Sequence, residues 1–386
     1  MDQVNVGLIG YKFMGKAHSN AYKSVGMFFP LKNRVVMKAI CGRDETAVRK
    51  AAETWGWGSY ETDWKKLIKR PDIDVIDVAT PGNLHPDMSI AAARAGKHVI
   101  CEKPLANSLA EARAMQKAVD KAGVKNMVFF NYRRVPAVSF ARQMIREGKL
   151  GDIYHFRTAY LQDWIVDPEF PLVWRLDKKI AGSGALGDIG AHITDLALFL
   201  IGEISEVVAD LKTFIKKRPL LESGSAFFAR KKTGPPQYGT VTVDDAAAFL
   251  ARFKNGALGT FEATRFATGR KNANQFEIYG SRGALRFDLE SLNELHFYSK
   301  DEAAPEQGFK RILVTEASHP YISAWWPPGH IIGYEHTFTN ALSDFFRSLE
   351  TDQPVSPDFR EGVRVQAVLD AVEKSAQRGK WVRVVP

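Results

Sequence analysis

The sequence predicts an α/β domain built on a parallel sheet, followed by an α+β domain built on an open, mostly antiparallel β-sheet. A length of 386 residues is sufficient for two domains that each have a core of their own. In the first third, short apolar runs alternate with helical patterns, whereas strand-like runs separated by tight turns dominate after residue 132. We therefore expect the first domain to span residues 1–131 and the second to span residues 132–386.

The first element is an apolar run over residues 4–9, which is short enough to be a buried strand and which Gly10 ends. Gly15 falls five residues later, where a helix can begin. This is the layout of the phosphate-binding turn of a dinucleotide-binding Rossmann domain, G-x-G-x-x-G. Lys12 stands at the position of the middle glycine. Its side chain leaves a pyrophosphate less room to approach the backbone, but it adds a positive charge near the two phosphates. An ordinary strand–turn–helix unit is the alternative interpretation.

Further strands of the first domain are predicted over residues 35–41, 75–79, 98–101 and 127–130. Helices are predicted between them, over residues 45–54, 87–95 and 109–121, the last with Ser108 as its N-cap. Continuous apolar strands that alternate with helices indicate a parallel sheet covered on both faces. Because such sheets bind ligands at the carboxyl ends of their strands, the residues that follow these strands are candidate site residues.

In the second domain, strands are predicted over residues 153–161, 246–253, 257–267, 275–279, 284–287 and 294–298. Tight turns at residues 254–256 and 280–283 join successive strands, which favours antiparallel pairing. Helices are predicted over residues 137–147, 187–201, 335–349 and 360–378, and a short strand over 381–385. Residues 215–240 form a basic segment rich in glycine and proline, which indicates a loop.

Composition and charge restrict the class of protein. The chain is 45% hydrophobic and 25% charged, and it contains neither an apolar run long enough to span a membrane nor a signal-peptide pattern. Its two cysteines, Cys41 and Cys101, end predicted strands, a pattern typical of a reduced, cytoplasmic protein. The net charge of +9 lies mostly in residues 1–131, which suits a polyanionic small ligand or a solvated lysine-rich surface. We expect no nucleic-acid or membrane partner, and the histidine spacing predicts no metal site.

Two motifs carry candidate catalytic groups. Lys103 follows a predicted parallel strand, where it can bind a substrate hydroxyl, although a surface lysine before a proline turn is the alternative. Asp188 and His192 are four residues apart and share one face of a predicted helix, which Asp195 continues. Histidine is the usual proton acceptor for an alcohol, and an aspartate one turn away can orient it. In the alternative, Asp188 only starts a helix and His192 is a buried, hydrogen-bonded histidine.

Taken together and in this order, the motifs resemble those of the Gfo/Idh/MocA family of NAD(P)-dependent sugar and inositol oxidoreductases. The matching segments read GLIGYKFMGKAH, ATPGNLH, CEKPLA, FNYRR, WR and GSGALGDIGAHITD. Within the family, YLQDW at residues 160–164 and PLVWR at residues 171–175 are most similar to glycoside and anhydrosugar dehydrogenases. The resemblance implies a Rossmann domain, NAD or NADP as cofactor, a sugar, glycoside or cyclitol as substrate, and a homodimer or homotetramer.

The resemblance also implies residue roles. The implied catalytic set is Lys103, Asp188 and His192. In this set His192 takes the hydroxyl proton, Asp188 orients or tunes His192, and Lys103 polarises the alcohol. The expected cofactor-binding residues are Gly10, Lys12, Phe13, Met14, Arg43, Thr80, Pro81, Asn83, His85, Glu102, Lys103, Asn131, Trp174 and Arg175. The expected sugar contacts, besides Asp188 and His192, are Tyr160, Gln162 and Trp164.

The choice between NAD and NADP is left open by the second predicted strand. NAD-specific members of the family usually place an acid where Cys41 or Gly42 falls, and that acid is missing here. Arg43 can meet a 2′-phosphate or stack on adenine, and Asp44 has the position of a cap for the next helix.

The function that we expect is hydride transfer between a secondary alcohol of a sugar, glycoside or cyclitol and a nicotinamide cofactor. One alternative is a redox-neutral glycoside-processing enzyme, acting through a 3-keto intermediate or as an NAD-dependent glycosidase. A second is a non-catalytic, nucleotide-binding regulator with the same fold. The sequence leaves open the identity of the sugar, the carbon that is oxidised, the direction of the reaction and the size of the oligomer.

Overall fold

The computed structural model describes residues 2–220 and 237–386, and the chain forms two compact units. One unit combines Met1–Ser139 with Leu313–Gln366, and the other combines Phe140–Ile312 with Ala367–Pro386. The expected domain limits, residues 1–131 and 132–386, stay a prediction. Residues 221–236 of the predicted loop lie outside the described residues. On either side of them, the loop prediction covers two short strands, β9 (Lys217–Pro219) and β10 (Tyr238–Thr240), which pair in antiparallel fashion.

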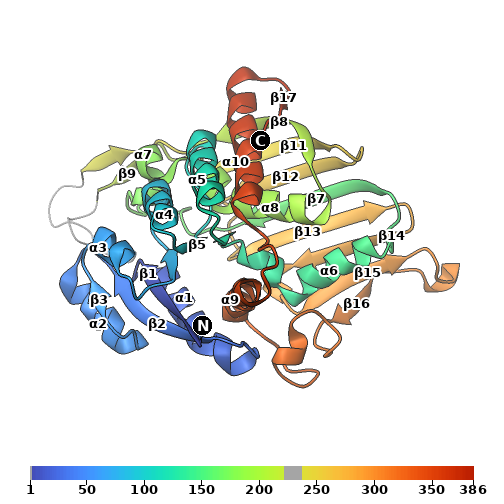
Figure 1. Ribbon diagram of the computed structural model, residues 1–386. Helices are drawn as coiled ribbons and strands as arrows, with labels where there is room; N and C mark the ends of the chain where they lie inside the picture. The colour runs from blue at the N-terminus through green and yellow to red at the C-terminus, as the bar shows by residue number, and fades with distance from the viewer. Residues whose placement is uncertain (1, 221–236) are drawn as a thin grey trace. The chain divides into compact units, whose positions relative to one another are not determined.

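The first unit is built on a six-stranded parallel sheet with the strand order β3-β2-β1-β4-β5-β6 (Figure 1). The strands in chain order, β1 to β6, are Gln3–Ile9, Arg34–Cys41, Tyr60–Glu61, Val75–Val78, His98–Cys101 and Asn126–Val128. This is the strand order of a Rossmann fold, so the predicted fold class of the N-terminal region is confirmed. The short strand β3 was not predicted, because two residues are too few to show a hydrophobic pattern.

Helices cover both faces of this sheet. The helices that follow β1 to β5, α1 to α5, are Phe13–Phe28, Glu45–Trp55, Trp64–Lys69, His85–Arg94 and Leu109–Ala122. Val4, Val6 and Leu8 of β1 lie in one core with the apolar residues of α1 and α2. Gly7 faces the opposite side, toward Leu67 of α3. The N-cap of α5 is Ser108, as predicted, and its hydroxyl accepts a hydrogen bond from the amide of Glu111 at 3.3 Å.

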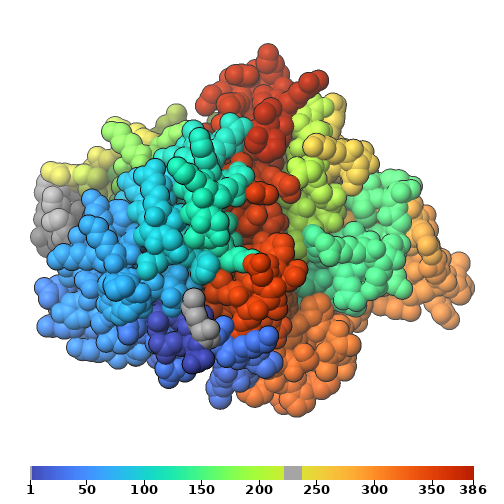
Figure 2. Space-filling view, in the orientation of Figure 1, coloured from blue at the N-terminus to red at the C-terminus, as the bar shows by residue number. Residues whose placement is uncertain are grey.

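A helix from far along the chain completes the first unit. Helix α9, Tyr334–Thr351, lies against α1 and places Phe338, Phe345 and Phe346 in the core with Val4 and Leu8 (Figure 1). The segment before it also belongs here, since the ring of Trp325 packs 4.4 Å from that of Phe28. In Figure 2 this orange segment adjoins the blue N-terminal residues at the surface. The contact joins residues about 300 apart in sequence, so no local pattern predicts it.

The second unit contains a nine-stranded sheet with the order β16-β15-β14-β13-β7-β12-β11-β8-β17. Its strands β7, β8 and β11 to β17 are Ile153–Leu161, Ile204–Lys212, Ala246–Phe253, Leu258–Thr264, Ala273–Gly280, Gly283–Asp288, Glu294–Ser299, Lys310–Leu313 and Val382–Arg383. The pair β7–β12 is parallel, and the neighbouring pairs on either side of it are antiparallel. The prediction of a mostly antiparallel sheet is therefore confirmed. Strand β8 was not predicted, because charged residues interrupt its apolar pattern.

Burial alternates along the strands of this sheet. On β11, Phe249, Ala251 and Phe253 are buried, whereas Leu250 and Arg252 between them are exposed. On this strand, one face therefore belongs to the core, and the other is exposed among the described residues.

The remaining helices are α6 (Pro136–Arg146), α7 (Lys178–Ala181), α8 (Ala191–Leu200) and α10 (Phe359–Arg378). A π-helical turn, Leu186–Gly190, leads directly into α8, so the predicted helix over residues 187–201 consists of two parts. Where the structure describes the chain, none of the helices is both long and apolar enough to cross a membrane.

We predict that α9 is essential to the core of the first unit. Phe345 is fully buried, so Phe345→Ala should lower the free energy of unfolding, measured in urea, by about 3–5 kcal/mol. Phe309→Ala is the matched control, because Phe309 is 47% exposed, and it should change stability by less than about 0.5 kcal/mol. Equal effects of the two substitutions would contradict this assignment of α9.

Candidate active site

The turn between β1 and α1 accepts only glycine at two positions. Gly10 has a φ of +123°, and a Cβ there would lie 2.4 Å from the carbonyl oxygen of Ala79. A Cβ at Gly15 would lie 2.2 Å from the carbonyl oxygen of Gly10. These two glycines therefore let the N-terminus of α1 press directly against β1.

Lys12 is the N-cap residue of α1, with a φ of −87° that any amino acid can adopt. Its ammonium group lies 5.1 Å from the centre of the Tyr11 ring, and its side chain makes no capping hydrogen bond. The first amides of this 16-residue helix have no acceptor within the helix, and together with the helix dipole they form a site suited to phosphate. The turn therefore fits a dinucleotide, while the effect of Lys12 on the pyrophosphate stays a prediction.

The end of β2 is shaped by Tyr11. A Cβ at Gly42 would lie 2.1 Å from the Tyr11 ring, so this glycine makes room for the ring. Asp44 caps α2, because its Oδ1 atom accepts a hydrogen bond from the amide of Ala47 at 2.9 Å, as predicted. Arg43 is exposed. Of the groups predicted to select the cofactor, the aspartate is therefore engaged with its helix, and the arginine faces solvent.

His85 ties together two of the loops that follow strands. Its ring is buried, with Nε2 2.8 Å from the carbonyl oxygen of Thr80 and Nδ1 3.0 Å from that of Pro104. Burial lowers the pKa of His85. Among the predicted residues near it, Pro81 is half-buried and Asn83 is exposed. The structure thus gives His85 a role in joining the loops after β4 and β5.

A buried charge network lies beside the predicted catalytic lysine. His18 of α1 places Nδ1 2.7 Å from Asp77 Oδ2 and Nε2 2.9 Å from Glu102 Oε1. The hydroxyl of Tyr22 donates to the same Asp77 oxygen at 2.7 Å. Burial alone would lower the pKa of His18, but the two carboxylates outweigh it and raise this pKa to about 10. His18 is therefore an imidazolium between two anions at neutral pH.

This network fixes the position of the Glu102–Lys103 peptide. The other carboxylate oxygen of Glu102 accepts a hydrogen bond from the amide of Lys103 at 3.1 Å. Glu102, which we expected to line the cofactor, thus directs its carboxylate toward protein groups. His18 and Asp77 were not predicted as site residues from the sequence. An aspartate inside the apolar strand β4 was a usable signal, because a buried acid needs a partner.

Three other predicted cofactor residues of the first unit differ in exposure. Phe13 is 67% exposed at the start of α1, and Met14 beside it is half-buried. Asn131 is buried, and its amide donates a hydrogen bond to Thr337 of α9 at 2.9 Å.

In the second unit, the π-helical turn carries Asp188 and leads to His192. The Asp244 carboxylate accepts hydrogen bonds from the amides of Gly184 and Leu186, at 2.7 Å and 2.8 Å, and so holds the start of this segment. Asp188 is partly exposed, whereas His192 is nearly buried, with its ring 5.9 Å from that of Tyr160. Asp195 is fully buried, like most of α8, and the expectation that it continues the face of Asp188 and His192 stays a prediction.

Two guanidinium groups approach the same oxygen of Asp188. Arg265 NH1 lies 3.7 Å from Asp188 Oδ2, and Arg175 Nε lies 3.9 Å from it. Arg175 also stacks on Trp174, with 4.4 Å between the guanidinium carbon and the centre of the ring. Burial lowers the pKa of Arg175, and the carboxylate of Asp188 opposes that shift. Arg175 was among the predicted residues, but Arg265, which follows β12, was missed.

The predicted sugar contacts form one hydrogen-bonded chain. The Asn272 side-chain oxygen accepts from the Tyr160 hydroxyl at 2.7 Å and from the Gln162 amide at 2.9 Å. Gln162 in turn accepts from the indole N–H of Trp164 at 2.9 Å. Asn272 was not predicted, because an isolated asparagine in a turn carries no distinctive pattern.

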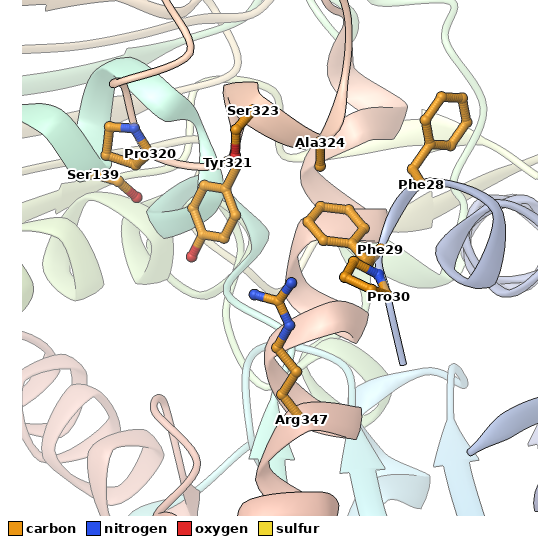
Figure 3. Close-up of a pocket in the computed structure, with 9 residues that line it drawn as sticks. All are labelled: Phe28, Phe29, Pro30, Ser139, Pro320, Tyr321, Ser323, Ala324 and Arg347. Atoms are coloured by element: carbon orange, nitrogen blue, oxygen red, sulfur yellow. The ribbon is translucent and has the colours of Figure 1, made fainter. Parts of the chain in front are cut away.

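A separate hollow lies within the first unit, and none of the predicted site residues lines it. Arg347 of α9 points toward Tyr321 and Phe29 there, and its guanidinium carbon lies 5.4 Å from the centre of the Phe29 ring (Figure 3). The walls contain one cation, Arg347, and one phenol, Tyr321, but no carboxylate or histidine. In the described parts of the chain, no three His, Cys, Asp or Glu side chains gather as metal ligands.

Two family models match the chain. The model described as "Oxidoreductase family, NAD-binding Rossmann fold" matches residues 4–130, and the "GFO/IDH/MocA C-terminal domain" matches residues 138–286. Levoglucosan dehydrogenase of Pseudarthrobacter phenanthrenivorans is 45% identical over 386 residues, covering 100% of this chain and 99% of that protein.

Solved structures agree over the full length. An oxidoreductase domain protein from Kribbella flavida superposes with a TM-score of 0.95 and 52% identity, with 100% of each chain covered. A levoglucosan dehydrogenase in complex with NADH and levoglucosan superposes with a TM-score of 0.94 and 44% identity, again with 100% of each chain covered.

The His18 network predicts a loss of stability at alkaline pH. The pKa of His18 is raised from 6.5 to about 10 in the folded state, so its contribution is complete below pH 6.5 and is lost as pH rises through 10. His18→Gln should lower the free energy of unfolding by about 3–5 kcal/mol at neutral pH, because it leaves two buried carboxylates without their cation. The difference between wild type and variant should shrink from pH 7 to pH 10 in urea titrations.

His85→Gln is the control for this measurement, because His85 is buried in the same unit and contacts carbonyl oxygens instead of carboxylates. Its difference from wild type should not shrink over this pH range. A pH-independent difference for His18→Gln would contradict the imidazolium assignment.

Proposed function

We propose that this chain, which belongs to the Gfo/Idh/MocA family of oxidoreductases, oxidises a secondary alcohol of a sugar, glycoside or cyclitol with a nicotinamide cofactor. The sequence motifs predicted this family and the enzyme class, a nicotinamide-dependent sugar dehydrogenase. The match to the family models and to a full-length relative confirms both predictions. The observation that carries the proposal is the Asp188–His192 segment: a π turn that Asp244 holds at its start carries a partly exposed carboxylate, and the helix that follows it carries a histidine.

Levoglucosan is the substrate that we propose to test first, since a full-length relative is named for it. The polar chain through Tyr160, Asn272 and Gln162 offers donors and acceptors for sugar hydroxyls. Trp164 adds an aromatic ring, which suits the apolar C–H face of a sugar.

Each catalytic residue then has a distinct task. His192 takes the hydroxyl proton as general base, and Asp188 orients it and offsets the charge that it gains. Lys103 donates a hydrogen bond to the alcohol oxygen and so favours its deprotonation. The chemistry that a bound nicotinamide supplies is acceptance of the hydride from the alcohol carbon.

The residues expected to hold the cofactor are those of the turn after β1 and of the loops after β2, β4 and β5. The close approach of Gly10 and Gly15 leaves the α1 amides available to the pyrophosphate. Between NAD and NADP we propose NAD, because a full-length relative is described in complex with NADH. Arg43 remains the group that would favour NADP.

We also propose a cytoplasmic homodimer or homotetramer. Cys41 and Cys101 are both free thiols, which suits a reducing compartment. The open face of the nine-stranded sheet exposes Leu250 and Leu258 on adjacent strands, and a second copy of the chain would cover it. Sugar, and neither nucleic acid nor a membrane, is the proposed partner.

The proposal predicts NAD reduction when levoglucosan is added to the purified protein, followed by the absorbance of reduced nicotinamide. His192→Ala and Lys103→Ala should each lower kcat by about 100-fold or more, because each removes a group that acts on the hydroxyl proton. His330→Ala is the control, since this exposed histidine is not among the predicted site residues and its ring lies 3.0 Å from the carbonyl oxygen of Pro327, and it should leave kcat unchanged.

The same assay separates the alternatives. Consumption of a glycoside without net absorbance change would favour a redox-neutral enzyme, and release of the aglycone would identify a glycosidase. Binding of NADH without turnover of any sugar would favour the regulator. Full activity of His192→Ala would contradict the residue roles.

The proposed assembly predicts that Leu250→Glu combined with Leu258→Glu lowers the mass measured by light scattering from that of an oligomer to that of a monomer. A charge buried in an interface without a partner opposes association. Phe309→Glu, which alters an exposed ring outside the strands, should leave the mass unchanged. A monomeric wild type would contradict the proposal.

A further inference from the structure

Two fully buried arginines of the second unit differ in how their guanidinium groups are used. Arg218 donates through both terminal nitrogens, to the carbonyl oxygens of Ile165, Asp167 and Phe170, and only its Nε atom lacks an acceptor among the described residues. Arg265 donates through NH2 to the carbonyl oxygen of Asp244 at 3.2 Å, while its Nε and NH1 atoms have no hydrogen-bond acceptor in the described structure. A buried guanidinium with a terminal nitrogen left without an acceptor is costly for stability, so the surroundings of Arg265 NH1 indicate what this arginine does.

The position of Arg265 suggests that role. Its NH1 atom lies 3.7 Å from Asp188 Oδ2, and its guanidinium carbon lies 5.4 Å from the centre of the Trp164 ring, a predicted sugar contact. Arg175 approaches the same carboxylate oxygen at 3.9 Å. Arg265 itself is shielded from solvent, so its attraction for Asp188 is screened far less than that of a surface arginine.

The chain also makes room for this arrangement. A Cβ at Gly184 would lie 1.7 Å from the Asp244 carbonyl oxygen and 2.9 Å from Arg265 NH2. The second glycine of the GSGALGD segment therefore admits both the Asp244 backbone and the Arg265 guanidinium. Asp244 in turn holds the amides of Gly184 and Leu186, so the arginine, the glycine and the π turn form one packed unit.

We propose that Arg265 is a positioning residue for the proposed oxidation, which acts by holding Asp188 as a carboxylate in one orientation beside His192. This inference rests on the proposed function. The charged groups that the described residues place near the Asp188 carboxylate include Arg175 from the segment after β7 and Arg265 from the end of β12, and His192 lies four residues further along the chain. In the reaction, the hydroxyl proton passes to His192 while Asp188 stays ionised and balances the charge that His192 gains. Arginine suits this task, because its guanidinium does not lose its proton in proteins.

A double-mutant cycle tests whether Arg265 acts through Asp188. Arg265→Met should lower kcat/KM for levoglucosan by about 100-fold in the wild-type background, mainly through kcat. In the Asp188→Asn background the same substitution should cost no more than about twofold, because the carboxylate that it positions is already gone. An equal loss in both backgrounds would overturn the proposal. The Kd of NADH, measured by fluorescence, should be the same in all four proteins.

Two further variants separate positioning from folding. Arg265→Lys keeps the charge, so it should recover part of the activity that Arg265→Met loses. Arg218→Met removes an equally buried arginine. It should therefore lower stability, but its effect on kcat/KM should not depend on whether Asp188 is present. The proposal would be overturned if Arg265→Lys were as inactive as Arg265→Met and if Arg265→Met and Arg218→Met showed the same coupling to Asp188→Asn.

A measurement without substrate keeps this inference distinguishable from the proposed function. In ¹³C spectra of the aspartate carboxyl groups, the Asp188 signal is identified by its loss in Asp188→Asn. The chemical shift of this signal should differ between the wild type and Arg265→Met, because the guanidinium beside the carboxylate is gone, and it should be the same in the wild type and Arg218→Met. An Asp188 signal that Arg265→Met leaves unchanged would overturn the proposal, whether or not any sugar is oxidised.

Discussion

The buried imidazolium of His18 is the interaction on which the carboxyl edge of the parallel sheet depends. It joins α1 to Asp77 of β4 and to Glu102 after β5. Glu102 in turn accepts a hydrogen bond from the amide of Lys103 and so fixes the position of that residue. A cation between two buried carboxylates is stable only while all three groups stay in place, because removing one leaves an uncompensated charge in a region of low dielectric constant. The lysine that we propose to act on the alcohol is thus attached to a rigid, ionic support.

The second unit uses the same principle around Asp188. The Asp244 carboxylate holds the start of the π turn, and the guanidinium groups of Arg175 and Arg265 approach the carboxylate that the turn presents. Lys103 and Asp188 are only partly exposed, whereas His18, Glu102 and Arg265, which hold them, are buried. Buried charges are costly for stability, so their concentration beside the candidate catalytic residues is consistent with selection for geometry at these positions.

The sequence predicted those features that depend on neighbouring residues. The glycines at positions 10 and 15 indicated the phosphate turn, because close contact between helix and strand excludes any Cβ there. Continuous apolar runs predicted the strands of the parallel sheet, and alternation predicted most of the second sheet. The motifs around Lys103 and Asp188 also predicted the family. Strand β8 was missed because charged residues mask its apolar pattern, and the position of α9 was missed because its partners lie about 300 residues away.

The sequence by itself therefore determined the fold class, the phosphate turn and the family, since each depends on the type and spacing of residues that are close together in the sequence. Only the tertiary structure decided which buried groups meet. His18, Asp77 and Glu102 are far apart in sequence, as are Asp188, Asp244 and Arg265, and no periodicity links them. The physical reason is that a hydrophobic pattern records which face of an element is buried, whereas a pairing between buried charges depends on the three-dimensional arrangement of several elements.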